Sequence, residues 1–562
     1  MYVTAYAPYG ADGIIIRVEA DIRRGIPGID ITGLAEGAVR EARERVRAAF
    51  RNSGYPFPQD RILINLAPAG VRKDGASLDL PIALAVMAAA GQVPGTAFPD
   101  KLMVLGELEL SGRLRPVRGV LAATAAGLRE GVRGFIVPLE NAPEAAILAS
   151  GRFAAASTLA EAVHALMTLT ETGAFPADST VLTDSVVPEG TEPPLRRTAA
   201  QGTPAWAGDF SEVRGQGRYK RALEITAAGG HNLLVFGPPG AGKTMLARRL
   251  PSIMSPLTAE EAVEVTRLHS LAGQINAEYS GPGAGLITHP PFRSPHHSAS
   301  AEGILGGGKT VRPGEISLAH FGVLFLDEGP EFRSNVLQSL REPLEDRVIT
   351  IARAEGPVRL PADFQLLLAA NPCPCGRLGM RPADGSGRED SSGWGDFPGA
   401  GAGCFCTPEE IHRYWRKFGA ALLDRVELRV TVVSPGMGEL SRGDEETSAG
   451  IARRVQRAVE IQRERFAGAR SFGEGGLCRR NARMGPGEIE KYCLLGEAAK
   501  QSFRRAAERL ALSGRAYHGI LRVARTIADL EGKDPIDTAH ILEAIQHRRL
   551  GEDPYDILTG NE

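Results

Sequence analysis

The sequence predicts an α/β protein that ends in a helical domain, and three observations lead to this fold class. Residues 1–168 alternate strand-like and helix-like segments. In the middle of the chain an α/β pattern surrounds a glycine-rich segment, and the last part is helical and rich in arginine. We therefore expect a mixed α+β N-terminal domain at 1–168, a linker at 169–207, an α/β core at 208–443 and a helical domain at 444–562.

Composition places the chain among globular proteins and narrows its partners. Its 562 residues suffice for roughly three or four domains. A net charge of −2 gives no overall basic signature for nucleic acid, so any such surface must be local. The most hydrophobic stretch, residues 80–90, is too short to span a bilayer, and the first residues lack the pattern of a signal peptide. We expect a cytoplasmic protein without membrane contact.

The N-terminal domain shows clear periodicity in four segments. Residues 14–19 and 61–66 have the pattern of strands, whereas residues 36–50 and 78–90 have helical spacing. Residues 172–207 lack periodicity and are rich in Pro, Thr, Ser and Gly, which predicts a partly disordered linker.

The glycine-rich segment of the core is a complete phosphate-binding loop, G-x-x-x-x-G-K-[ST]. Its glycines let backbone N–H groups approach a polyphosphate. Lys243 reaches the β- and γ-phosphates, and the Thr244 hydroxyl binds Mg²⁺. An apolar strand pattern before the loop and a helical pattern after it put the phosphates at a helix N-terminus, which favours anions. We expect ATP and Mg²⁺ to bind here. The residues that hold them are Gly237, Pro238, Pro239, Gly240, Ala241, Gly242, Lys243 and Thr244.

Two acidic residues follow a second apolar strand pattern at 323–326, in the Walker B arrangement. Asp327 is placed to hold Mg²⁺ through water, and Glu328 to polarise the attacking water. The alternative is that both acids are ordinary solvated residues of a turn. A third buried-strand pattern, residues 366–370, ends in Asn371, a residue that in isolation is often only a turn former.

Four of the six cysteines form two close pairs that suggest a metal. Two thiolate pairs supply an S₄ set for structural Zn²⁺, which would close a Gly-rich loop at 381–403. Free reduced thiols and redox pairing are the alternatives, because the C-x-C spacing, with one residue between the two cysteines of a pair, indicates a metal site less strongly than C-x₂-C. Cys478 and Cys493 are expected to be plain buried thiols. The four candidate ligands are Cys373, Cys375, Cys404 and Cys406.

Two basic insertions, residues 306–312 and 347–353, are candidate contacts to DNA phosphates. The second, residues 347–353, alternates like a hairpin strand with its partner near 357–360. Arginines at 453–465 form a further stripe, interrupted by acids, for which a solvated, salt-bridged helix is the alternative. Ordinary surface charge explains the insertions equally well. The basic residues of the insertions are Lys309, Arg312, Arg347 and Arg353.

Five long motifs follow one another in an order that resembles a known family. They are His231–Leu234, Pro313–His320, Leu326–Glu328, Asn371–Gly376 and Ala524–Leu530. Together they resemble the YifB/ComM family of magnesium-chelatase-like AAA+ ATPases. The resemblance implies an AAA+ core with a C-terminal helical lid, working as a homo-hexameric ring. Gly329 before Pro330, and residues 418–421 before Leu422, depart from the family pattern without removing a catalytic side chain.

The resemblance also implies roles for three residues. Asn371 corresponds to sensor 1, which orients the attacking water. Arg425 resembles the arginine finger that acts on a neighbouring subunit, an ordinary surface pair with Asp424 being the alternative. Arg515 resembles sensor 2, which contacts the γ-phosphate from the lid, and Arg522 on the same helix face is the competing candidate.

The N-terminal domain resembles the domain of Lon-type proteases without its base. Residues 73–77 match the segment of the nucleophilic serine, with Ser77 at that place, and the likeness continues at 105–108 and 112–117. A Ser–Lys dyad needs a lysine to take the hydroxyl proton. Leu121 stands where that lysine belongs, so we expect no peptidase activity. Lys73 is the nearby candidate for a rearranged dyad.

Two classes of function follow from these resemblances. ComM resemblance implies a DNA helicase that promotes branch migration on branched or single-stranded DNA during homologous recombination and natural transformation. The alternative is a chelatase-like or MoxR-like ATPase that remodels a protein partner without DNA. Magnesium insertion into a porphyrin is disfavoured, because the chain lacks an obvious porphyrin-binding subunit.

Overall fold

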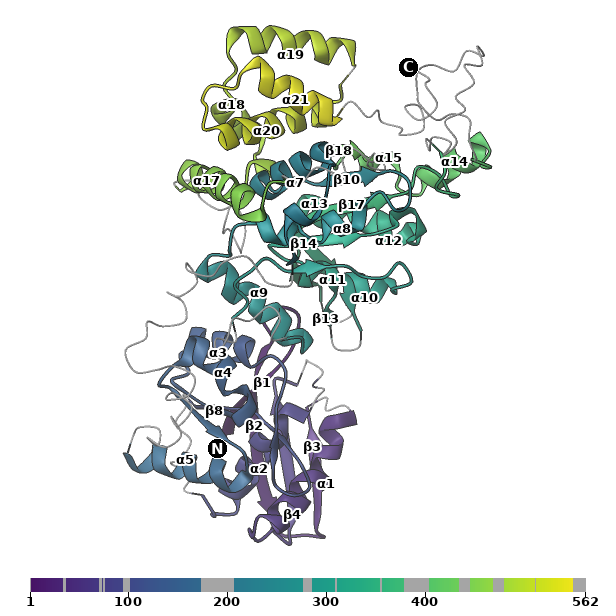
Figure 1. The fold of residues 1–562 in the computed structure, drawn as a ribbon. Helices are drawn as coiled ribbons and strands as arrows, with labels where there is room; N and C mark the ends of the chain where they lie inside the picture. The colour runs from purple at the N-terminus through teal and green to yellow at the C-terminus, as the bar shows by residue number, and fades with distance from the viewer. Residues whose placement is uncertain are drawn as a thin grey trace.

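The computed structural model describes most of the chain and divides it into two α/β bodies and a helical end. The first sheet and its helices lie at one end of the molecule, and the core with the C-terminal helices lies at the other (Figure 1). The Gly-rich loop at 381–403, Lys309, Cys478 and nearly all of the predicted linker lie outside the described residues. The structure describes residues 2–33, 37–69, 73, 76–93, 102–172, 207–275, 286–308, 311–353, 356–378, 404–433, 445–467, 480–510 and 512–548.

A mixed seven-stranded sheet in the order β3-β4-β2-β1-β5-β8-β9 forms the N-terminal body. The strands predicted at 14–19 and 61–66 are part of β2 and β4, which pair antiparallel. From β1 onward the order β5-β8-β9 continues in parallel. The strands are β1 (Tyr2–Ala7), β2 (Ile14–Arg23), β3 (Gly28–Thr32), β4 (Arg61–Ala67), β5 (Leu102–Val104), β8 (Gly134–Pro138) and β9 (Phe153–Ala156), with a small β6 (Glu107–Leu108) and β7 (Leu114–Arg115) hairpin.

Five α-helices accompany this sheet, and α2 is the most buried of them. The apolar run after Asp79 is buried along nearly the whole of α2, as expected for a helix packed on a sheet. Helix α5 ends beyond the boundary predicted at residue 168. The helices are α1 (Gly37–Asn52), α2 (Asp79–Ala89), α3 (Val120–Arg129), α4 (Ala142–Ala149) and α5 (Leu159–Thr172).

The core is a parallel five-stranded sheet in the order β11-β14-β17-β10-β18. Strands β14 and β10 are buried throughout, because helices cover both faces of a parallel sheet and only apolar runs suit that position. The carboxyl ends of all five strands therefore meet at one edge. The strands are β10 (Leu233–Phe236), β11 (Phe292–Arg293), β14 (Val323–Leu326), β17 (Gln365–Ala370) and β18 (Leu428–Thr431).

Short helices and two hairpins complete the core. The hairpin predicted at 347–360 is present as β15 and β16, and β12 pairs with β13 in the same antiparallel way. The hairpin strands are β12 (Gly306–Gly307), β13 (Arg312–Pro313), β15 (Val348–Ile351) and β16 (Val358–Pro361). The helices are α7 (Gly217–Gly229), α8 (Lys243–Ala247), α9 (Ala259–Ala272), α10 (Ala301–Leu305), α11 (Glu315–Leu318), α12 (Ser334–Ser339), α13 (Arg341–Asp346), α14 (Pro408–Arg416) and α15 (Ala420–Leu423).

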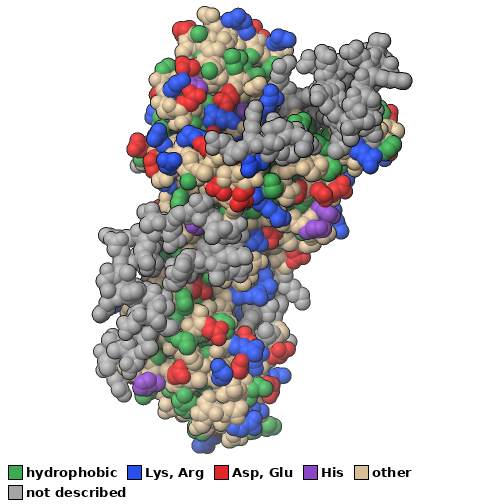
Figure 2. Space-filling model, viewed as in Figure 1, with side chains coloured by type: hydrophobic (Ala, Val, Ile, Leu, Met, Phe, Trp, Pro, Cys, Tyr) green, Lys and Arg blue, Asp and Glu red, His purple; other side chains and the backbone are tan. Residues whose placement is uncertain are grey.

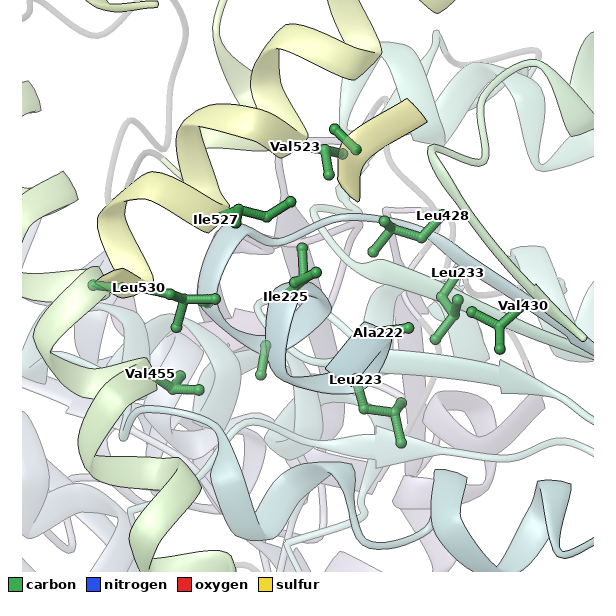
Figure 3. Packing of buried hydrophobic residues seen from close by; sticks show 14 of the residues in the cluster. Ala222, Leu223, Ile225, Leu233, Leu428, Val430, Val455, Val523, Ile527 and Leu530 are labelled. Atoms are coloured by element: carbon green, nitrogen blue, oxygen red, sulfur yellow. The ribbon is translucent and has the colours of Figure 1, made fainter. Parts of the chain in front are cut away.

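The C-terminal helices pack on the core through α7, α17 and α20. Figure 3 shows apolar side chains of these helices meeting those of β10 and β18 in one buried cluster. Ser513 caps α20, since its hydroxyl accepts from the backbone N–H of Ala516. The helices are α17 (Ser448–Phe466), α18 (Pro486–Tyr492), α19 (Glu497–Arg509), α20 (Gly514–Glu531) and α21 (Thr538–Arg548). Within the described part of the chain, none has the length and apolar character needed to cross a bilayer.

Helix α9 of the core lies between the two sheets and contacts the N-terminal body (Figure 1). Leu121 of α3 is buried in one cluster with Leu257 and Val265. The backbone N–H of Gly119 donates to the carbonyl of Ser270 at 3.2 Å. The β1–β2 turn also enters the core, where Ala11 is buried in the cluster that includes β15 and β16 residues. The two bodies are therefore joined by apolar packing as well as hydrogen bonds.

Candidate active site

The predicted phosphate loop follows β10 at the carboxyl edge of the core sheet. Gly240 and Gly242 have φ values of 79° and 84°, in the left-handed region that favours glycine. A Cβ on Gly237 would lie 2.2 Å from the carbonyl oxygen of Val432, so this glycine permits close packing of the loop against the end of β18. Helix α8 starts at Lys243, which puts the loop at a helix N-terminus as predicted.

Lys243 is held inside this loop. Its Nζ donates to the carbonyls of Gly237 at 2.6 Å and Pro238 at 2.8 Å. It also donates to Oδ1 of Asn371 at 3.1 Å, so the residue after β17 lies directly at the phosphate loop. Burial lowers the pKa of Lys243, which is the expected effect of removing an ammonium group from water.

Thr244 and Asp327 meet at the same edge. The Thr244 hydroxyl donates to Oδ2 of Asp327 at 2.7 Å. A hydroxyl and a carboxylate this close together are oxygen donors of the kind Mg²⁺ prefers, so this pair fits the predicted ion. The structure thus brings together three strand ends that sequence reasoning had placed together.

Glu328 stands beside them in an unusual backbone conformation, with φ of 52°. Its side chain is 57% exposed, and Oε2 lies 3.7 Å from Nδ1 of His297. A histidine beside the expected catalytic carboxylate was not predicted, because its approach depends on the loop after β11.

Two further residues that sequence reasoning missed support the loop from α7. Gln216 Nε2 donates to the carbonyls of Ala241 at 3.1 Å and Val433 at 2.6 Å. The buried hydroxyl of Tyr219 donates to the carbonyl of Lys243 at 3.2 Å, and burial raises the pKa of this phenol. Neither residue belongs to a recognisable motif, so only the fold reveals them.

Arg425 lies at the opposite, amino edge of the sheet. Its carbonyl accepts a hydrogen bond from Asn232 Nδ2 at 2.9 Å, and Asn232 directly precedes β10. The phosphate loop lies at the other end of that strand. Arg425 therefore does not reach the loop of its own chain, and its guanidinium pairs instead with the carboxylate of Glu345.

Arg515 lies with Arg425 and not over the phosphate loop. It pairs with the same Glu345 and, at 3.4 Å, with Asp424. The role expected of Arg515, contact with a γ-phosphate from the lid, stays a prediction, and its guanidinium does not lie at the phosphate loop of its own chain in this arrangement. The competing residue, Arg522, is partly buried at the same edge, and burial lowers its pKa despite the nearby carboxylate of Glu427.

The four clustered cysteines converge beside Asn371. Three Sγ–Sγ distances are 3.3, 3.6 and 3.7 Å, and all four sulfurs lie within 4.8 Å of one another. Four thiolates around one Zn²⁺ would be about 3.8 Å apart, given Zn–S bonds of about 2.3 Å. Burial raises the pKa of Cys375, but backbone N–H groups outweigh it and lower the pKa to about 6, which favours the thiolate. The residues present fit a zinc site.

The residues of the N-terminal domain that resemble a Lon-type site lie in closed surroundings. Lys73 is buried, and its Nζ donates to the carbonyls of Gly33 at 2.8 Å and Pro68. Ser77 is partly buried in a short 3₁₀ turn before α2. Leu121, at the position of the Lon lysine, is fully buried against the core. No base stands at that position, and α9 covers it.

Three related families match separate stretches of the chain. Residues 209–392 match the family described as "Magnesium chelatase, subunit ChlI", residues 18–141 match "Subunit ChlI of Mg-chelatase", and residues 445–548 match its C-terminal family. A Lon protease of Salinispora arenicola is 30% identical over 148 residues, which cover 25% of this chain and 19% of that protease.

Two relatives match almost from end to end. An uncharacterised protein YifB of Salmonella typhimurium is 39% identical over 548 residues, covering 97% of this chain and 96% of the relative. The competence protein ComM of Haemophilus influenzae is 37% identical over 551 residues, covering 98% of this chain and 97% of the relative. With the site geometry above, these matches show that the chain belongs to the YifB/ComM family of magnesium-chelatase-like, AAA+-like ATPases.

Proposed function

We propose that this chain hydrolyses ATP in a ring, in which each phosphate loop is completed by arginines of the neighbouring subunit. The observation that carries the proposal is the separation of the two halves of the site. Lys243, Thr244, Asp327 and Asn371 meet at the carboxyl edge of the core sheet. Arg425 lies at its amino edge. A closed ring of like subunits, with six as the expected number, brings these edges together.

In such a site each residue of the chain has a separate task. The loop amides and Lys243 hold the phosphates, and Thr244 with Asp327 holds Mg²⁺, which neutralises charge on the transferring phosphoryl group. Glu328 is exposed at the strand end and accepts a proton from the attacking water. Asn371 orients that water, and Arg425 of the neighbour stabilises the transition state.

Mixing two inactive variants tests the shared site. Lys243→Ala removes a phosphate contact but leaves the arginines intact, whereas Arg425→Ala does the reverse. Each variant alone should lose nearly all ATPase activity, by about 10³-fold for the arginine. Mixed rings should regain activity, because one kind of interface then combines an intact loop with an intact arginine. If mixed rings stay inactive while both variants assemble, the proposal of a shared site fails.

We further propose that the motor moves DNA, as a helicase that promotes branch migration. The support is the family, the name of the relative ComM, a competence protein, and two neighbouring hairpins of the core. Arg312 of β13 and Arg359 of β16 are exposed, and Arg353 donates to the carbonyl of Gly308, which joins the two hairpins. Exposed guanidinium groups on adjacent hairpins suit a phosphate backbone.

Charged side chains outside these two hairpins give less support to DNA binding. Figure 2 shows acidic and basic side chains interspersed over the visible face of both bodies. In α17, Arg454 pairs with Glu224 and Glu446, and Arg465 pairs with Asp529. This helix therefore has the salt-bridged character that was the alternative to a DNA-binding stripe. The runner-up function, remodelling of a protein partner, uses the same ATPase site without DNA.

A three-strand branch-migration assay separates the two functions. The wild type should migrate junctions and Lys243→Ala should not, and DNA should stimulate hydrolysis with a steep fall as salt is raised. Arg312→Ala and Arg359→Ala should weaken the stimulation while basal hydrolysis persists. ATP hydrolysis that ignores DNA, with no junction movement, would favour the protein-remodelling function.

We also propose one structural Zn²⁺ per chain, bound by Cys373, Cys375, Cys404 and Cys406. The cluster has a direct connection to the active site. Cys373 follows Asn371 and Pro372, and the Pro372 carbonyl accepts from the Trp415 indole at 3.1 Å. A bound metal would fix this segment and with it the orientation of Asn371.

A further inference from the structure

We propose that Glu345 is the residue that positions Arg425 and Arg515 as one unit for the nucleotide of the neighbouring subunit. This inference rests on the proposed shared site and adds to it a residue that belongs to no motif. Glu345 lies near the end of α13, before the β15–β16 hairpin.

The two oxygens of this carboxylate each bind a different arginine. Oε2 accepts from Arg425, and Oε1 accepts from Arg515. The two guanidinium groups come from parts of the chain separated by some 90 residues, one before β18 and one at the start of α20. Because one carboxylate accepts from both guanidinium groups, it offsets the repulsion between the two like charges and holds both cations at one place.

The other contacts of the two arginines fix their guanidinium groups only in part, so the carboxylate of Glu345 is needed to orient them. Arg425 also donates to the carbonyl of Ala421 at 2.6 Å, and its side chain is 14% exposed. Arg515 is 43% exposed, and besides Glu345 it pairs with Asp424 at 3.4 Å. Asp424 is itself engaged by Arg548 at 2.8 Å. Arg515 therefore depends on Glu345 more than Arg425 does.

A triphosphate carries oxygens that accept from both arginines at once, as the carboxylate does. Planar guanidinium groups that are already held side by side match such an acceptor, so binding it costs little further conformational entropy. Glu345 acts through the arginines and does not touch the nucleotide. Its loss should therefore lower the rate of hydrolysis and leave nucleotide affinity nearly unchanged, because the phosphate loop that binds ATP lies on another chain.

The test uses Glu345→Ala in the full chain, with Glu342→Ala as the matched control. Glu342 is an exposed carboxylate one helical turn earlier in α13, so both changes remove the same charge from the same helix. Glu345→Ala should lower kcat by about 10- to 100-fold, as misplaced catalytic groups do, with KM within about twofold of the wild type. Glu342→Ala should hydrolyse ATP as the wild type does. Ring assembly of both is checked by sedimentation.

Mixing shows where Glu345 acts. Rings that combine Glu345→Ala with Lys243→Ala subunits should regain activity, as rings of Arg425→Ala with Lys243→Ala do. If Glu345→Ala keeps wild-type activity, or if only the Arg425→Ala mixture recovers, the role of Glu345 is overturned and the shared site stands. If neither mixture recovers, the shared site itself fails, and the inference fails with it.

Discussion

The carboxylate of Glu144 accepts a hydrogen bond from the hydroxyl of Ser270, which joins α4 of the N-terminal domain to α9 of the core. The same oxygen accepts from the backbone N–H of Leu121 at 2.7 Å, and the other accepts from Asn141 at 3.2 Å. All of these groups are buried. The junction between the domains therefore contains a carboxyl group that water does not solvate.

This junction should respond to pH. Burial raises the pKa of Glu144 in the folded chain, so the unfolded chain releases this proton first as the pH rises. The stability that the protonated carboxyl supplies is complete below the ordinary glutamate value of 4.5 and is lost as the pH rises toward the folded-state pKa. Thermal unfolding of Glu144→Gln across this range should show a smaller fall with pH than the wild type. Glu140→Gln, at an exposed carboxyl, should follow the wild-type curve.

An ion pair across the same junction allows a matched comparison. Oδ1 of Asp12 accepts from Arg267 of α9 at 2.7 Å and from Arg129 of its own domain at 2.9 Å. Arg267 is the more buried of the two, so Arg267→Ala should cost about 1 kcal/mol and Arg129→Ala only about 0.3 kcal/mol. Chemical denaturation measures both. Equal costs would mean that the contact between the domains contributes no more than a surface pair.

Restoring the Lon lysine should not restore a protease. Leu121→Lys places an ammonium group in an apolar cluster between the domains. The nearby carboxyl group of Glu144 already accepts hydrogen bonds from Ser270, Asn141 and the backbone of residue 121. We expect a loss of about 3–5 kcal/mol in unfolding free energy and no labelling of Ser77 by a fluorophosphonate probe. Leu121→Met, which keeps the volume, should cost under about 1.5 kcal/mol. Labelling of Ser77 in the wild type would show that a rearranged dyad, such as one with Lys73, is active.

Removal of zinc should lower ATP hydrolysis without removing ATP binding. A strong chelator, or Cys404→Ser, frees the segment after Asn371, so that the attacking water is less well oriented. Metal analysis should find one zinc per wild-type chain and less in the variant, and kcat should fall while nucleotide affinity stays within about twofold. Cys493→Ser, at a buried thiol outside the cluster, should keep its metal. If the wild-type protein contains no zinc, the proposed zinc site is wrong.

Features that depend on short stretches of chain could be predicted from the sequence. The phosphate loop, the acids after β14 and Asn371 after β17 each follow an apolar strand, and parallel strands bring their carboxyl ends to one edge. The two cysteine pairs could be proposed for the same reason. Their convergence to within 4.8 Å could not, because residues far apart in the chain come together only in the fold.

The residues that stabilise the site from outside its motifs could not be predicted from the sequence. Tyr219 and Gln216 stabilise the loop through backbone carbonyls, which any residue possesses and no motif records. Glu345 belongs to α13 and meets Arg515 of α20 only in the fold, because 170 residues separate the two in the chain. Arg515 lies at the start of α20, and the edge of the sheet that this helix reaches could not be predicted from periodicity.

The direction of β10 has a consequence for how many complete sites an assembly of subunits contains. Asn232, which holds Arg425, and Gly237, which begins the phosphate loop, are at opposite ends of that strand, about 16 Å apart at about 3.3 Å per residue. A contact that joins these ends is one-way, so an open row of subunits always leaves one loop without arginines and one set of arginines without a loop. In the proposed ring, only closure pairs every loop, and the loss of a single subunit would inactivate a site on a neighbouring chain that is itself intact.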